Sequence, residues 1–261
     1  MTRRLVISLT LVSLVSPASS ARLRQPQPDA YSPQLQQLLQ RLGSEAETLI
    51  ASTPSFTCDE TATSQALRDQ KVLRSVSLSG TVRTLRKPDG SFVETYDYKH
   101  QHILLFIPKV PPLFVGGGFD TALSYFLPSA QACYRYSLSP GRIAFETRSG
   151  QVSGHICTEQ GLKGFALLDP SGAITHIERS IPPAVAKPLK DVSFAAIDIT
   201  PVTLNGRVYQ LSHHMVATQS LDNPTVTGRF EATYTHCHLF TSTVTLGPSS
   251  EIPAASATSP Q

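Results

Sequence analysis

The stretch "VLRSVSLSGTVRTL", residues 72–85, alternates between two kinds of side chain. Val72, Val76, Leu78 and Val82 lie at even positions, whereas serine, threonine and arginine take the odd positions between 75 and 83. Successive side chains of a β-strand point to opposite faces, so the pattern predicts a strand with one buried and one solvated face. A half-buried strand of this kind is typical of an antiparallel sheet.

Turn motifs follow this strand and recur along the chain. "KPDG", residues 87–90, combines a proline that fixes φ with a glycine that accepts a positive φ, and a return strand is expected over 92–107. Similar turns are expected at "SPG" (139–141), "DPSG" (169–172) and "LNG" (204–206), each between strand-like segments. The sequence therefore predicts a long antiparallel meander.

A helix is expected before the first strand, in "YSPQLQQLLQRLGSEAETLIAS", residues 31–52. Ser32 suits the N-cap and Pro33 the first helical position. Its apolar residues recur at steps of three and four: Leu35, Leu38, Leu39, Leu42, Ala46, Leu49 and Ile50. We expect this face to cover the core. Contact with a partner or a membrane surface is the alternative, and the glutamine-rich, rather than basic, polar side favours the core.

One segment interrupts the strands. "VPPLFVGGGFDTALSYFLP", residues 110–128, has three consecutive glycines and then a short helical piece over 119–127. A sheet of this length twists and curls, and helices against its concave side bury both apolar surfaces. The predicted fold is mainly β (α+β): a long, strongly curved antiparallel half-barrel, with the N-terminal amphipathic helix and the short helical insert on the concave side.

The start of the chain has the layout of a secretory signal peptide, with two arginines, an apolar segment over 5–15 and then small residues. We expect a signal at 1–21, a linker at 22–31, one domain at 32–246 and a disordered tail at 247–261. Loss of Arg3 and Arg4 lowers the net charge from +3 to +1, so nucleic acid is not expected as a partner. The expected location is outside the cytoplasm, periplasmic or extracellular.

The chain has 4 cysteines, all beyond the signal, and an even number in an exported protein favours disulfides. Three pairings are conceivable. We favour Cys133 with Cys157, closing a loop of about 25 residues, and Cys58 with Cys237, closing about 180. In the chain-entropy model, closing these two loops stabilises the folded protein by roughly 3 and 5 kcal/mol, respectively.

No catalytic or cofactor motif is present: the sequence contains no nucleophile elbow, H-E-x-x-H, C-x-x-C or phosphate-binding loop. The segment "YTHCHLF", residues 234–240, resembles a metal-binding motif, but alternation turns both histidines away from Cys237 unless a bulge intervenes. The same alternation places five histidines on apolar or aromatic faces: His100, His102, His213, His236 and His238. Each is either hydrogen-bonded to a neighbour or part of a metal site.

Three features together resemble a known group of proteins: the export signal, the helix followed by "PSFTCDET" (54–61), and the meander containing "GGFDTALSYFLPSAQACYRYSL" (117–138). The layout is similar to the bacterial outer-membrane lipoprotein carrier LolA and its LppX-type relatives, and to uncharacterised exported bacterial proteins. The resemblance implies a half-barrel lidded by helices, whose apolar concave face receives acyl chains. The glycine run, the cysteines and the histidines depart from the carrier pattern.

The sequence thus predicts a non-catalytic cell-envelope protein that binds an apolar or amphipathic, lipid-like small molecule without a cofactor. The predicted lining, for which ordinary core is the alternative, is Phe106, Phe114, Phe119, Leu123 and Phe126. The alternative function is metal binding, or metal-dependent catalysis, by the five histidines. Peripheral membrane contact stays open, and nothing in the sequence indicates an oligomer.

Overall fold

The computed structural model describes part of the chain, and all structural statements below concern that part. The described residues are 31–88, 90–105, 113, 115–116, 118–148, 151–152, 155–157, 161–182, 186, 191–221 and 225–241. The expected signal, nearly all of the expected linker and the expected tail lie outside these residues. Among the described residues, no helix combines the length and the apolar character that crossing a bilayer requires.

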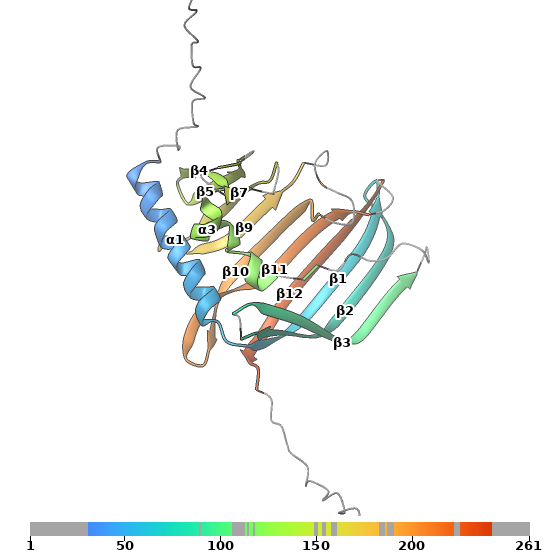
Figure 1. Cartoon of the computed structure of the whole chain (residues 1–261). Helices are drawn as coiled ribbons and strands as arrows, with labels where there is room; N and C mark the ends of the chain where they lie inside the picture. Colours follow the sequence, from blue (N-terminus) through green and yellow to red (C-terminus); the bar gives the residue numbers. More distant parts are fainter. Residues whose placement is uncertain are drawn as a thin grey trace, which may run out of the picture. The chain divides into compact units, whose positions relative to one another are not determined.

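Ten strands form one open, curved, antiparallel sheet (Figure 1). From edge to edge the strands are β3 (Phe92–Leu105), β2 (Lys71–Arg86), β1 (Phe56–Arg68), β12 (Val226–Leu239), β11 (Arg207–Ser220), β10 (Phe194–Leu204), β9 (Ile174–Ser180), β8 (Lys163–Leu168), β5 (Arg142–Thr147) and β4 (Tyr134–Ser139). A separate pair consists of β6 (Gln151–Val152) and β7 (His155–Ile156). Most neighbours are consecutive hairpins, as predicted, but β1 pairs with β12 inside the sheet.

Residues 72–85 lie in β2, and their alternation is as predicted from residue 76 onward. Val72, which was expected on the same buried face, lies beyond a register shift and is 50% exposed. Val76, Leu78 and Val82 are at most 4% exposed and belong to the core, on the sheet face that α1 covers. The turn after β2 is closed by a hydrogen bond from Gly90 N to Lys87 O of 3.0 Å, and Gly90 has a φ of 84°. The three other predicted turns also contain a glycine with positive φ.

Helix α1 (Pro33–Ser52) has the predicted bounds, and Ser32 Oγ accepts a hydrogen bond from Leu35 N at 3.2 Å. Its apolar stripe packs into the same core cluster as the inner face of the sheet. At its other end, Arg86 of β2 donates to Ile50 O at 2.6 Å and to Thr53 O at 2.9 Å. These bonds satisfy carbonyl groups that a helix end otherwise leaves without partners.

The insert lies on the same side of the sheet as α1 (Figure 1). The single short helix expected over 119–127 is replaced by three turns: α2 (Gly118–Thr121), η1 (Ser124–Phe126) and α3 (Pro128–Gln131). The insert touches α1 at Gly43, where a Cβ atom would come within 2.9 Å of Gln131 Nε2 and 3.2 Å of Phe126 O. A side chain there would have to displace the Gln131 amide and press on the Phe126 carbonyl, so glycine lets the insert lie close to α1.

Both predicted disulfides are present. Cys58–Cys237 links β1 to β12 across a separation of 179 residues, and Cys133–Cys157 spans 24 residues. Cys58 is fully buried, so the first disulfide is part of the core. Disulfides persist in oxidising compartments, which agrees with an exported protein.

Candidate functional site: two hollows beside helix α1 and a buried carboxyl group

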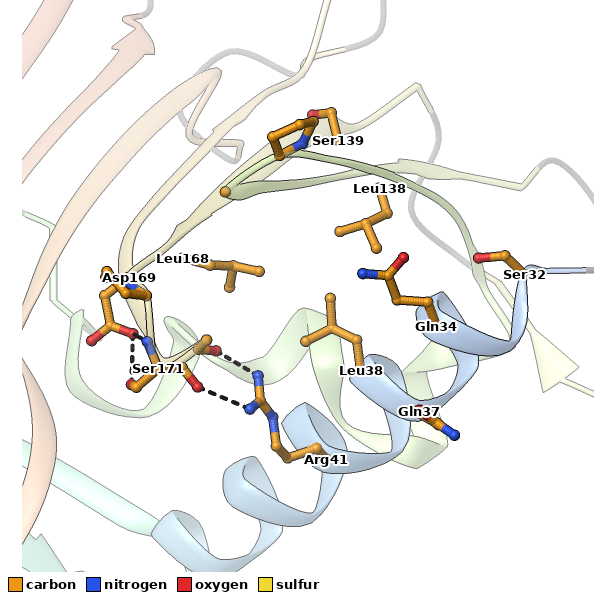
Figure 2. Close-up of a pocket in the computed structure, with 14 residues that line it drawn as sticks. Ser32, Gln34, Gln37, Leu38, Arg41, Leu138, Ser139, Leu168, Asp169 and Ser171 are labelled. Carbon is orange, nitrogen blue, oxygen red and sulfur yellow. Dashed lines mark hydrogen bonds between the residues drawn. The ribbon is translucent and has the colours of Figure 1, made fainter.

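The first hollow lies beside the N-terminal half of α1 and has a volume of about 860 Å³. Figure 2 shows Leu38, Leu138 and Leu168 pointing into it from the helix and from two strands. Arg41 ties the helix to the β8–β9 turn by donating to Ser171 O at 3.0 Å and to Gly172 O at 2.9 Å. We call this space the N-terminal hollow. Its wall mixes apolar and polar groups.

The β8–β9 turn at the wall of the N-terminal hollow is held by Asp169. Its Oδ1 atom accepts hydrogen bonds from Ser171 N at 2.8 Å and from Ala173 N at 2.9 Å (the first is drawn in Figure 2). The side-chain hydrogen bond with Ser171 and the backbone bond from Ala173 lower the pKa of the Asp169 carboxyl group. This side of the hollow is therefore a preformed polar turn.

The second hollow lies beside the C-terminal half of α1 and has a volume of about 640 Å³. Its wall comes from α1, the insert, the start of β9 and the start of β11, and its apolar members are Leu42, Leu49, Leu123, Ala173, Ile174, Val208 and Tyr209. Val208 is 65% exposed. Glu45 and Arg207 provide charges on the same wall. We call this space the C-terminal groove.

Of the five predicted lining residues, the structure places Leu123 in the wall of the C-terminal groove. Phe126 is fully buried and Phe119 is 6% exposed, so these two belong to the filled core that was the alternative. Phe119 packs against Phe56 with ring centroids 5.1 Å apart. Phe106 and Phe114 lie outside the described residues.

The prediction that His236 and His238 face inward is wrong, because β12 contains a bulge. Thr235 pairs with Asp59 and His238 with Thr57, so His236 and Cys237 together oppose Cys58. His236 has a φ of 49°, and its side chain is 83% exposed. The extra residue reverses the alternation, which turns Cys237 inward to its disulfide and leaves His238 exposed.

A second bulge changes the prediction for His213. Asp198 pairs with His214 and Ile199 with Ser212, so His213 is the extra residue of β11 and is exposed. Its Nδ1 atom lies 3.1 Å from Tyr234 O. The remaining two histidines are in β3, and their side chains lie outside the described residues: His100 and His102. Among the described side chains, no group of three His, Cys, Asp or Glu residues could hold a metal ion.

A chain of polar side chains crosses four strands on the face of the sheet opposite to α1. Asp198 Oδ1 lies 2.6 Å from His176 Nδ1, and Asp198 Oδ2 lies 3.1 Å from His214 Nδ1. His214 Nε2 continues to Glu231 Oε1 at 3.3 Å. Burial opposes ionisation of Asp198, but the two histidines outweigh it and lower its pKa. This cluster cross-links strands and was not predicted.

The most unusual group of the inner face is Glu60 of β1. It is 1% exposed, and neither carboxyl oxygen has a hydrogen bond of ordinary geometry. Glu60 pairs with Gly80 on one side and Tyr234 on the other, and Gly80 pairs with Tyr98. One cross-strand row therefore runs from Tyr98 through Gly80 and Glu60 to Tyr234. Gly80 has no side chain to separate Tyr98 from Glu60.

Burial is the largest effect and raises the pKa of Glu60 to about 7. The Tyr98 hydroxyl opposes this rise, the nearby charge of Glu94 adds to it, and the Tyr234 hydroxyl opposes it least. Burial likewise raises the pKa of both tyrosines, so each remains protonated near neutral pH. Tyr96 donates a hydrogen bond to Glu94 and stacks on Tyr98 with ring centroids 5.9 Å apart. We call Glu60, Glu94, Tyr96, Tyr98 and Tyr234 the acid–tyrosine cluster.

The acid–tyrosine cluster was not predicted, although the sequence contains a signal for it. In "FTCDETA", residues 56–62, alternation places Glu60 on the same face as Phe56, Cys58 and Ala62. All four are at most 5% exposed. A carboxyl group on an otherwise apolar face of a central strand marks a group that is costly to bury and needs an explanation.

The first testable prediction concerns Glu60→Gln. Because the pKa of Glu60 is raised from 4.5 to about 7 in the folded protein, the fold holds this proton more tightly than the unfolded chain does. Stability should therefore fall as the pH rises from about 4.5 to 7, by on the order of 2 kcal/mol. Glu60→Gln should remove this loss. Urea unfolding, followed by circular dichroism at pH 5 and pH 8, measures the effect.

The control for Glu60→Gln is Glu146→Gln, which removes an exposed carboxylate paired with Arg135 at 3.1 Å. We expect the control to leave the pH dependence of stability unchanged. If Glu60→Gln destabilised the protein equally at pH 5 and pH 8, the raised pKa of Glu60 would be refuted.

Comparison with known proteins gives similarities at the level of structure. No protein-family model matches the chain, and no curated protein matches its sequence. A crystal structure of a DUF1329 family protein from Desulfovibrio piger matches 77% of this chain and 92% of its own, with 9% identity and a TM-score of 0.35. A LolA superfamily protein from Nitrosomonas europaea matches 78% of this chain and 94% of its own, with 9% identity and a TM-score of 0.30.

The similar structures thus include a LolA superfamily protein, the group that the layout of the sequence resembles. At TM-scores of 0.35 and 0.30 the similarity carries no argument about a ligand or a site. The functional proposals below therefore rest on the residues of this chain.

Proposed function

We propose that this protein is an exported, non-catalytic binding protein of the cell envelope that holds an apolar or amphipathic small molecule in the C-terminal groove. The observation that carries the proposal is the groove itself, a space of about 640 Å³ whose wall is mainly apolar. Binding sites for small molecules have volumes of about 300–1,000 Å³ and combine apolar walls with a few polar groups.

The two ends of such a ligand would meet different parts of the wall. Leu42, Leu49 and Leu123 provide apolar contacts for a hydrocarbon chain. Arg207, on the same wall, provides a cation for an anionic head group such as a carboxylate. Val208 is 65% exposed to solvent. A bound hydrocarbon chain would cover this side chain, which would account for an apolar residue at the surface.

Support for export comes from the two disulfides and from the signal-like N-terminus, and a periplasmic or extracellular location is part of the proposal. The ligand would be a lipid-like molecule met in that compartment.

Binding of a fluorescent fatty acid tests the proposal and gives the second prediction. Val208→Asp should weaken binding at least about tenfold, because a bound chain would bury the new carboxylate. Val72→Asp is the matched control, since Val72 is also an exposed strand valine, 50% exposed, and does not line the groove. Fluorescence titration of both variants measures the difference.

Native mass spectrometry of the purified protein provides a second readout, and a co-purified amphiphile is the expected result. The proposal fails if the unsubstituted protein binds no fluorescent fatty acid. It also fails if Val208→Asp and Val72→Asp bind the probe equally well.

A further inference from the structure

We propose that the acid–tyrosine cluster is a binding site for an ammonium group, in which Glu60 is the counter-ion. The proposal is independent of the C-terminal groove, because none of the five cluster residues lines that groove. It rests on a buried carboxyl group without an ordinary hydrogen bond and on the aromatic side chains around it.

Glu60 requires a partner when it is ionised. A buried carboxylate is costly unless a cation or several hydrogen-bond donors compensate its charge. Among the ion pairs that the described residues form, none includes Glu60. Glu94 adds further negative charge, and its effect on Glu60 is repulsive. Below pH 7 a proton neutralises the Glu60 carboxylate, and above pH 7 a bound cation would compensate its charge.

The groups around Glu60 favour an ammonium ion over a metal ion. The described groups that face Glu60 are Glu94, Tyr96 and Tyr98 of β3 and Tyr234 of β12, while β2 contributes Gly80. All three tyrosines are neutral phenols at pH 8 because burial raises their pKa, and neutral phenols are poor metal ligands. Ca²⁺ takes six to eight oxygen ligands, drawn from carboxylates, carbonyl groups and water. Two carboxyl groups do not provide that set.

An ammonium group fits these partners better. Its N–H groups can donate to the two carboxyl oxygens of Glu60, which are otherwise without ordinary hydrogen bonds. Its single charge matches that of the ionised Glu60 carboxylate. Tyr96 and Tyr98, whose rings are nearly parallel with an interplanar angle of 21°, provide aromatic faces of the kind that attract cations. The expected ligand is therefore the ammonium ion itself or the protonated form of a primary amine.

The test, our third prediction, uses methylammonium chloride with the full-length protein at pH 8. At tenfold its Kd, methylammonium should raise the Tm by about 3–6 °C. Sodium chloride controls for ionic strength, and tetramethylammonium chloride controls for a cation without N–H donors. Both should leave the Tm nearly unchanged. At pH 5, where Glu60 holds its proton, the shift with methylammonium should disappear.

Two variants locate the effect. Glu60→Gln should lose the methylammonium shift relative to its own Tm without ligand. Glu146→Gln removes an exposed carboxylate outside the C-terminal groove and should keep the shift. An equal shift in Glu60→Gln overturns the proposal, and so does a shift that sodium or tetramethylammonium reproduces. Stronger stabilisation by calcium chloride than by methylammonium also overturns it, in favour of a metal site.

Calorimetry of the unsubstituted protein keeps the proposal falsifiable if Glu60→Gln does not fold. Because the cation replaces the Glu60 proton, binding should release close to one proton at pH 6 and almost none at pH 8.5. Titrations in two buffers with different ionisation enthalpies measure this number. Binding without proton release at pH 6 would exclude Glu60 as the counter-ion.

Discussion

Replacement of Cys58 and Cys237 by alanine is expected to destabilise the protein by about 5 kcal/mol, the largest effect that we predict. The disulfide closes a loop with a sequence separation of 179 residues, so its loss restores much freedom to the unfolded chain. The half-buried Cys237 and the fully buried Cys58 lie in the core, and the substitutions also remove their packing. Small domains have total stabilities of about 5–15 kcal/mol, so this variant should be close to unfolding.

The matched control for this variant replaces Cys133 and Cys157, whose loop spans 24 residues. The chain-entropy model gives about 3 kcal/mol for that loop. Urea unfolding with detection by far-ultraviolet circular dichroism suits both variants, since the chain contains no tryptophan. Equal losses for the two disulfides, or a larger loss for the shorter loop, would contradict the prediction.

Phe126→Ala should lower the free energy of unfolding by about 3–5 kcal/mol, the second largest effect that we predict. The Phe126 ring is fully buried and packs against Phe145 at 5.8 Å and Tyr136 at 6.1 Å between ring centroids. Its removal leaves a cavity where the insert meets α1 and the sheet. Urea unfolding measures the change in the free energy of unfolding.

Leu167→Ala is the control for Phe126→Ala, because Leu167 lies in β8 and is 39% exposed. This substitution should lower the free energy of unfolding by less than about 1 kcal/mol. A loss below about 1 kcal/mol for Phe126→Ala as well would mean that the insert is not packed against the core as described. Phe126→Ala should still bind the fluorescent fatty acid, because Phe126 does not line the C-terminal groove.

Local patterns in the sequence predicted the local structure well. The alternation in residues 72–85 corresponds to β2, and Ser32 and Pro33 begin α1 as expected. The glycines of the four turns have positive φ values of 67–84°. Each of these features depends on neighbouring residues only, which is why a single sequence reveals them. Both disulfides were also predicted, on the even number of cysteines in an exported chain.

Long-range structure was harder to predict from the sequence. The pairing of β1 with β12 depends on residues far apart in the chain, and no local pattern reveals it. The bulges at His213 and His236 reverse the alternation over one or two residues, so strict alternation placed three histidines on the wrong face. The C-terminal groove combines four elements and could not be assembled without their packing. Among the predicted lining residues that the structure describes, Leu123 alone belongs to the groove.

The position of β12 between β1 and β11 has a consequence for biosynthesis. Until β12 (Val226–Leu239) has been synthesised, β1 and β11 lack the strand that joins them. Contacts between such distant segments form slowly. The complete ten-stranded sheet therefore cannot form before residue 239 has been synthesised.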